Sequence, residues 1–118
     1  MSSNISKEMA KIAANALADK KASDVKIIDI SNISVIADYF VIGSASNINQ
    51  VQALVDNVEE QMHMAGYKDP RVEGHGNSTW VLMDFEDIIV HVFSEEDRAF
   101  YNLERIWKDG KELDLESL

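Results

Sequence analysis

The stretch Tyr39-Phe40-Val41-Ile42-Gly43-Ser44-Ala45-Ser46-Asn47 joins a continuous apolar run to the start of a helix. The unbroken run 39–42 is typical of a central strand that is buried on both faces. Asn47 can cap the helix while Gln50, three residues on, returns a bond, as in a capping box. Apolar residues then recur at helical spacing until Gly66, a residue type that commonly ends helices. A buried strand followed by a crossover helix predicts an α/β fold with a mixed sheet.

Apolar spacing and turn residues predict the remaining elements on both sides of this unit. They are a helix over 6–21, strands over 25–30 and 71–73, a hairpin of strands 80–83 and 88–93, and a third helix from Ser94 to Gly110. The predicted order is α-β-β-α-β-β-β-α, with about five strands in the sheet and helices packed on it. We expect residues 1–108 to form a single domain and residues 109–118 to form an acidic C-terminal tail.

The charge balance limits the classes of partner. The chain has 118 residues, of which 21 are acidic and 11 are Lys or Arg, so its net charge is −10. Binding to DNA or RNA depends on Lys and Arg, so we expect no direct DNA contact and little direct RNA contact. Anionic membranes are disfavoured for the same reason. The chain has no cysteine, no apolar signal segment at its start and no apolar run of about 20 residues, which predicts a cytoplasmic protein.

Acidic residues are concentrated late in the sequence. From Asp84 to Asp97 there are six acids and no Lys or Arg. This run has two interpretations: a solvated acidic rim that keeps the protein in solution, or a docking surface for a basic partner.

Few residues have the spacing that catalysis or metal binding requires. His63, His75 and His91 lie on three different predicted elements, without the short spacing of metal ligands. The sequence contains no Gly-x-Ser-x-Gly nucleophile elbow. We therefore predict no catalytic residue, no metal and no cofactor.

An enzymatic alternative remains open at this point. Gly43 and Ser44 stand between a strand and a helix, where backbone N–H groups can bind an anion. Asp84 and Glu86 have the two-residue spacing of metal-binding carboxylates in nucleotidyltransferases, although they lie far downstream and enter a turn. The alternative function is a metal-dependent nucleotidyltransferase or nucleotide-binding protein. The simpler interpretation of Gly43 and Ser44 is the approach to a capped helix.

The strand that begins at Trp80 is informative because of its alternation. Val81, Met83 and Phe85 would share one face as a core set, so Trp80, Leu82 and Asp84 would point to the other. If a helix covers that second face, Trp80 belongs to the core. If the face is open, an aromatic and an apolar side chain framed by acids resemble the anchor and rim of a protein interface.

Several segments together carry a family resemblance. They are Ala37-Asp38-Tyr39-Phe40-Val41-Ile42-Gly43, Arg71-Val72-Glu73-Gly74, Trp80-Val81-Leu82-Met83-Asp84, Asp87-Ile88-Ile89-Val90-His91-Val92-Phe93 and Tyr101-Asn102-Leu103-Glu104-Arg105-Ile106-Trp107. In this order and at these distances they resemble the ribosomal silencing factor family, also called Iojap-like proteins, over nearly the whole chain.

This resemblance implies a translation repressor that is not an enzyme and has a nucleotidyltransferase-like fold. Members of the family bind the large ribosomal subunit through its fourteenth protein and block joining of the small subunit. They thereby lower translation when nutrients are limiting. The resemblance also implies that the free protein can form a homodimer.

Trp80 and its strand neighbours match the part of the family motif that is associated with the ribosomal contact. We expect Trp80 and Leu82 to anchor the contact, and Asp84 and Glu73 to pair with Lys or Arg of the ribosomal protein. His75, in the loop after Glu73, completes this candidate set. A homodimer could use the same apolar strip, so that one use would exclude the other.

Overall fold

A computed structural model describes residues 4–31, 37–74, 80–95 and 111–113 of the chain. The elements are α1 (Asn4–Asp19), β1 (Ser23–Asp29), β2 (Tyr39–Ala45), α2 (Ile48–Met64), β3 (Arg71–Glu73), β4 (Trp80–Asp84), β5 (Ile88–Ser94) and β6 (Lys111–Leu113). The predicted mixed α/β fold is confirmed, and element bounds differ from the prediction by three residues or fewer in the first helix and the first five strands. No helix among the described residues is long and apolar enough to cross a membrane.

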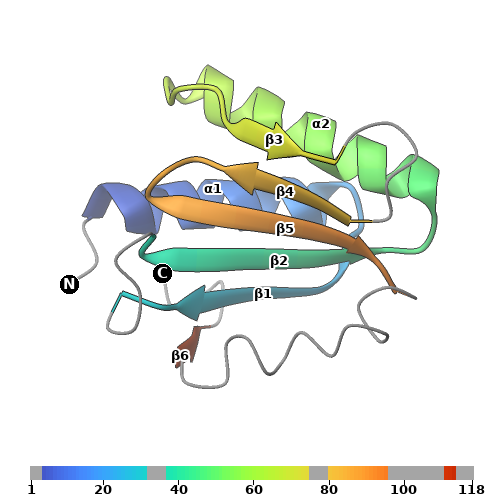
Figure 1. The fold of residues 1–118 in the computed structure, drawn as a ribbon, viewed down its shortest axis with the longest axis horizontal. Coiled ribbons are helices and arrows are strands. Elements are labelled where there is room, and N and C mark those ends of the chain that lie inside the picture. Colours follow the sequence, from blue (N-terminus) through green and yellow to red (C-terminus); the bar gives the residue numbers. More distant parts are fainter. Residues whose placement is uncertain (1–3, 32–36, 75–79, 96–110, 114–118) are drawn as a thin grey trace.

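The strands form one six-stranded sheet in the order β3-β4-β5-β2-β1-β6 (Figure 1). Among the described strands, β2 and β5 are the one parallel pair, and every other neighbouring pair is antiparallel. The run 39–42 is therefore central, as predicted, and β2 is almost entirely buried. The chain leaves β2 through α2 and passes through β3 and β4 before it enters β5. Parallel strands need such a long connection, because a tight turn can join only antiparallel strands.

The C-terminal part of the sheet differs from the prediction. Lys111–Leu113 pairs antiparallel with β1, so a segment that we expected to lie in an acidic tail supplies the sixth strand. The strand that begins at Ile88 ends at Ser94, the residue expected to cap a third helix, and Glu95 directly after it is helical, in agreement with that prediction. From residue 96 to residue 110, that predicted helix lies outside the described residues.

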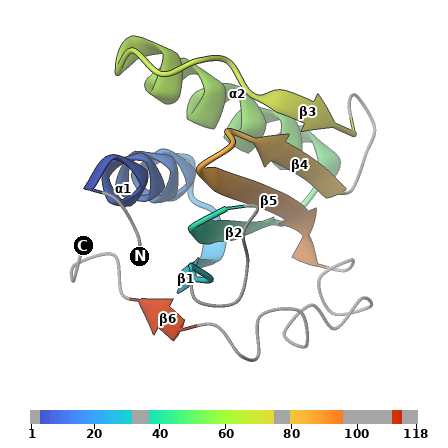
Figure 2. The same cartoon turned by 60° about the vertical axis from the view of Figure 1, so that its left-hand side comes forward.

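The helices α1 and α2 cover the same face of the sheet, as the two views in Figures 1 and 2 show. The main core lies between them and the sheet, and it includes the predicted set Val81, Met83 and Phe85 of β4. The side of α1 that faces the core is rich in alanine, so the helix approaches the sheet closely. A Cβ atom added to Gly43 would lie 3.0 Å from a side-chain carbon of Leu17, which explains why β2 has a glycine there.

The other face of the sheet carries a second, smaller apolar cluster. Its buried members are Ile28, Ile30, Ala37, Ile42 and Phe93, and the half-buried Phe40, Trp80 and Ile89 pack against them. Burial on this face is uneven. Residues of β1 and β2 such as Ile28 and Ile42 are completely buried, whereas Trp80 and Leu82 of β4 are only half-buried.

The side chains of α2 fix the end of α1. The Gln50 amide donates to the carbonyl oxygens of Lys20 and Lys21, and the buried Asn57 amide donates to that of Ala16. Asn47 caps α2 as predicted, accepting a bond from the Gln50 N–H. The Gln50 side chain returns a bond to the Ser46 N–H, one residue before the position of a standard capping box.

The two helices end in the same hydrogen-bond pattern with different residues. At the end of α2, the N–H groups of Gly66 and Tyr67 bond to the carbonyls of His63 and Met62, which is a Schellman motif. In α1 the corresponding left-handed position is held by Lys21. Lys21 has a φ of 64° and Gly66 a φ of 91°, a region that favours glycine.

At these two left-handed positions we expect opposite effects on stability: replacing the glycine should lower it, and introducing a glycine should raise it. Gly66→Ala should lower the free energy of unfolding by about 1 kcal/mol, since nothing lies within 4 Å of the added Cβ and only the backbone conformation opposes it. Lys21→Gly should raise it by up to about 1 kcal/mol. Urea denaturation measures both changes. Asn15→Gly, inside α1, is the control and should be destabilising; a loss of stability in Lys21→Gly would contradict the prediction.

Candidate functional site

The strand register brings most of the predicted site residues together. Trp80, Leu82 and Asp84 alternate with the core residues of β4 and share the face of the sheet opposite the helices, as expected. Glu73 of β3 is the cross-strand partner of Leu82. His75 lies outside the described residues. The site thus spans the two strands at one edge of the sheet, where the second face is least buried.

Trp80 is held in place by aromatic neighbours on β5. Its ring lies 5.1 Å from that of Phe93 and 6.3 Å from that of His91, measured between centroids. His91 in turn stacks on Phe93 at 5.7 Å and meets the edge of Phe40 at 5.1 Å. The indole is therefore fixed on one side by a packed row of rings. Trp80 is therefore neither fully buried nor fully exposed, but lies half-buried at the margin of the second apolar cluster.

A pocket of about 270 Å³ opens beside the indole. Trp80, Leu82, Glu73 and Gly74 line it, so three of the predicted site residues form one cavity. The floor combines an aromatic and an aliphatic side chain, and the Glu73 carboxylate at its rim is exposed. Such a pocket can accept a side chain that has an apolar stem and a positively charged end.

Carboxylates dominate the charge around this edge, with the basic residue Arg71 of β3 among them. Glu73, Asp84, Glu86 and Asp87 lie on β3, β4 or the turn that follows β4. Arg71 is the cross-strand partner of Asp84, so the acidic run from 84 to 97 has a basic neighbour that lies outside the run in sequence. The acid at position 84 is also tied locally, because its carboxylate accepts a bond from the Glu86 N–H at 2.8 Å.

Sequence reasoning missed the ring row formed by Phe40, His91 and Phe93. The hairpin turn contained the signal for part of it. Phe85 donates its N–H to Ile88, which fixes the pairing of β4 with β5 and places His91 opposite Leu82 and Phe93 opposite Trp80. The alternation of β5 therefore predicts which rings flank Trp80 once the turn is known.

His91 is electrically neutral at pH 7 because of its burial. Its Nδ1 atom is buried and has no hydrogen-bond partner among the described residues. Burial lowers the pKa of His91 from its ordinary value of 6.5 to about 4. The imidazole therefore acts as an apolar ring in the row that supports Trp80.

The residues of the enzymatic alternative are not brought together. Ser44 is almost completely buried, and Gly43 is occupied by its contact with Leu17. Ser44 of β2 pairs with Phe93 of β5, which pairs with Trp80 of β4. Asp84 is therefore two strands away from Ser44 and about 13 Å further along β4 than Trp80. In the part of the chain that the structure describes, no group of His, Asp or Glu could hold a metal ion.

Comparisons with known proteins point to one family. The family model described as RsfS, ribosomal silencing factor during starvation, matches residues 3–118. The ribosomal silencing factor RsfS of Bacillus subtilis is 40% identical over 93% of this chain and 93% of its own length. The protein of the same name from Halalkalibacterium halodurans is 39% identical over 94% of this chain and 95% of its own. The crystal structure of a Chromobacterium violaceum protein, 31% identical, superposes with a TM-score of 0.83 over 86% of this chain and 85% of that chain.

The state of His91 predicts how stability depends on pH. Since the folded-state pKa lies below the unfolded value, the unfolded state binds the proton more tightly, and stability should fall as the pH drops from 6.5 to about 4. The loss should reach roughly 2–3 kcal/mol.

His91→Phe, which keeps an aromatic ring in the row, should remove this part of the pH dependence in thermal melts at pH 7, 6 and 5. His63→Gln is the matched control, because the His63 side chain is 72% exposed. A parent protein with the same stability at pH 7 and pH 5 would contradict the assignment.

Proposed function

The chain belongs to the ribosomal silencing factor family, and from this premise we propose that the β3–β4 edge is its contact with the large ribosomal subunit. The partner is a basic protein of that subunit, the fourteenth as the family resemblance implies. The bound domain occupies a surface that the small subunit needs, and so represses translation when nutrients are limiting. The observation that carries the proposal is the pocket formed by Trp80, Leu82 and Glu73.

The edge has the physical properties of an interface anchor. Trp80 is half-buried and backed by Phe93 and His91, so it loses little conformational freedom on binding. Tryptophan in a preformed pocket is among the side chains that contribute most to protein interfaces. The surrounding carboxylates would meet a basic partner first and raise the rate of association.

The same charges support selectivity on a particle made largely of RNA. A net charge of −10 repels phosphates, so the protein gains little from non-specific contact with RNA. Repulsion from the surrounding backbone would disfavour wrong landing sites, while a basic protein surface remains attractive. The mechanism is steric, and it requires no bond to be made or broken.

A homodimer in the free state is compatible with this proposal. The half-buried Trp80 and Leu82 form an apolar strip that two copies could share. Since one strip cannot hold both partners, dimer formation would compete with ribosome binding. Sedimentation velocity at several protein concentrations, with and without large subunits, measures this competition.

The principal test is the removal of the anchor. We expect Trp80→Ala to weaken co-sedimentation with purified large subunits at least about 30-fold, the effect of losing an interface anchor of about 2 kcal/mol. Neither the parent protein nor the Trp80→Ala variant should sediment with small subunits.

Met64→Ala is the matched control, because Met64 is an apolar side chain on α2 that is 72% exposed. Leu82→Ser tests the same pocket without removing the indole, and circular dichroism verifies that both variants are folded. Unchanged binding of the folded Trp80→Ala and Leu82→Ser proteins would rule out this edge as the contact.

The rim carboxylates should act mainly on the rate of association. Glu73→Gln combined with Asp84→Asn should slow association several-fold at low salt and reduce its dependence on ionic strength, with a smaller effect on dissociation. Surface plasmon resonance on immobilised large subunits measures both rates. Glu59→Gln combined with Glu60→Gln on α2 is the charge-matched control; an equal effect of the two pairs would show that only net charge matters.

The enzymatic alternative has a direct test of its own. Calorimetry with ATP and GTP in the presence of magnesium should detect no binding, because Gly43 and Ser44 lie far from Asp84. Binding that is lost in Asp84→Asn would revive the nucleotidyltransferase interpretation.

A further inference from the structure

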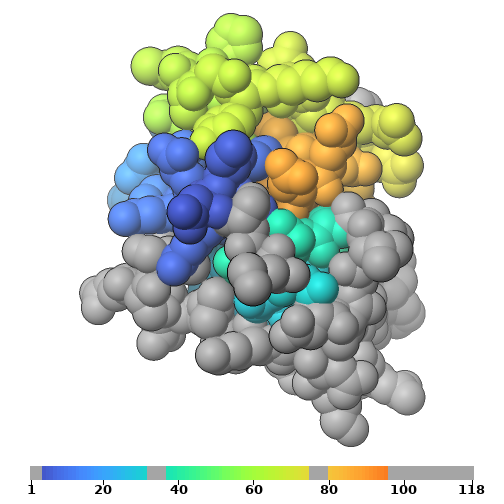
Figure 3. Space-filling view, turned by 90° about the vertical axis from the view of Figure 1, so that its left-hand side faces the viewer, coloured from blue at the N-terminus to red at the C-terminus, as the bar shows by residue number. Residues whose placement is uncertain are grey.

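A second pocket lies at the other end of β4, beyond the Trp80 surface. Figure 3 shows the face on which the start of α1, the segment after α2 and the turn between β4 and β5 come together. The pocket has a volume of about 370 Å³, which falls within the range of small-molecule sites. Asp84 is the one residue that it shares with the proposed ribosomal contact.

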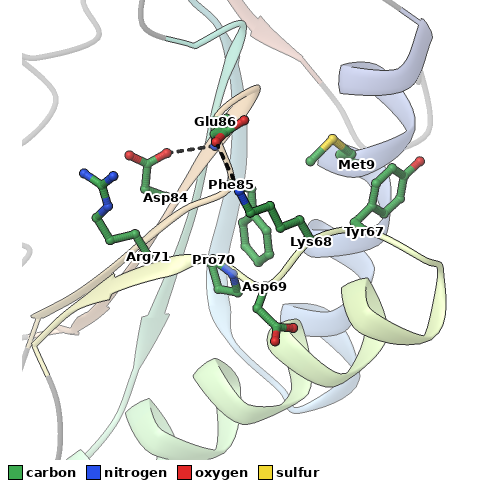
Figure 4. Close-up of a pocket in the computed structure, with 9 residues that line it drawn as sticks. All are labelled: Met9, Tyr67, Lys68, Asp69, Pro70, Arg71, Asp84, Phe85 and Glu86. Carbon is green, nitrogen blue, oxygen red and sulfur yellow. Dashed lines mark hydrogen bonds and ion pairs between the residues drawn. The ribbon is translucent and has the colours of Figure 1, made fainter.

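The base of this pocket is apolar and already packed. Met9 of α1 is 4% exposed and Phe85, at the end of β4, is 7% exposed. Pro70 and the ring of Tyr67 complete this surface (Figure 4). The Tyr67 hydroxyl is engaged elsewhere, since it donates to the Glu8 carboxylate at 2.9 Å. The floor therefore suits an apolar group with no polar demand of its own.

Charges of both signs stand over this floor. Lys68 Nζ and Glu86 Oε1 are 4.0 Å apart, and their side chains are 86% and 80% exposed. In Figure 4 the Lys68 side chain reaches across toward Glu86 near the Phe85 ring. An ion pair this long and this exposed holds its partners weakly, so a ligand can separate them at little cost.

The second pair at the rim is also mixed. Arg71 and Asp84 are cross-strand partners and line the same pocket. An anion that enters the pocket would be attracted by the two basic groups but repelled by the carboxylates of Glu86, Asp84 and Asp69, and the reverse would hold for a cation. A molecule that carries both charges close together satisfies both members of a pair at once.

The backbone that carries the acidic partner is fixed before any ligand arrives. Glu86 has a φ of 74°, and its N–H donates to the Asp84 carboxylate at 2.8 Å. The N–H of Phe85 and the carbonyl of Ile88 close the same turn at 3.0 Å. A turn fixed in this way lowers the conformational cost of binding.

We propose that this pocket binds a free α-amino acid with an apolar side chain. The ligand ammonium contacts Glu86, the ligand carboxylate contacts Lys68, and the side chain lies on Met9 and Phe85. The two charges of an α-amino acid are one carbon apart, which suits a basic and an acidic group that are 4.0 Å apart. The site shares only Asp84 with the proposed ribosomal contact, and none of the ligand contacts named above involves Asp84, so the proposal does not depend on the proposed function.

The test is a nuclear magnetic resonance titration of the full chain with L-leucine and L-phenylalanine. We expect saturable shifts of the backbone amides of residues 67–69, 71 and 84–88, with the Trp80 indole signal unchanged. N-acetyl-L-leucine lacks the ammonium charge and L-leucinamide lacks the carboxylate, and each should bind about tenfold more weakly, the effect of losing a hydrogen bond to a charged group.

Variants of the two charged residues complete the experiment. Lys68→Gln and Glu86→Gln should each weaken binding of L-leucine about tenfold. Lys11→Gln, a change of an exposed lysine on α1, should have no effect. The proposal is overturned by the absence of saturable shifts at about 10 mM ligand, by equal binding of either analogue, or by unchanged binding to both Lys68→Gln and Glu86→Gln.

Discussion

The parallel pairing of β2 with β5 is the interaction on which the rest of the structure depends. Seven consecutive residue pairs, from Tyr39–Ile88 to Ala45–Ser94, set the register of the sheet. Because both strands are buried, a shift by one residue would move every side chain to the wrong face. This register directs one set of side chains to the helices and the other set to the aromatic row behind Trp80.

The two faces of the sheet differ in how much apolar surface they leave exposed. The face under the helices carries the main core, and its polar links, such as the bond from Asn57 to Ala16, are internal. The opposite face grades from fully buried residues on β1 and β2 to half-buried ones on β4. The proposed contact therefore lies where the packing of the second face ends. A site of this kind needs no moving part, which is consistent with the steric mechanism that we propose.

Local signals in the sequence predict much of this arrangement. The unbroken run of β2, the cap at Asn47 and the alternation of β4 identify the central strand, the crossover helix and the face that carries Trp80. Other features depend on contacts between distant segments. The segment Lys111–Leu113 has no strand-like alternation from which β6 could be predicted. Arg71 lies beside Asp84 only because β3 pairs with β4. The left-handed conformation of Lys21 could not be predicted, because the sequence has no glycine at this position. Hydrogen bonds at the end of α1 impose the conformation instead.

The pairing of β6 with β1 has a consequence for synthesis of the protein. Residues 27–29 bond to residues 111–113, so the contact spans most of the chain. While the chain is being translated, the outer edge of β1 has no partner until those late residues leave the exit tunnel. An uncovered strand edge is a site for wrong pairing with other nascent chains. The chain thus completes its sheet with residues that are synthesised more than 80 positions after the strand that they cover.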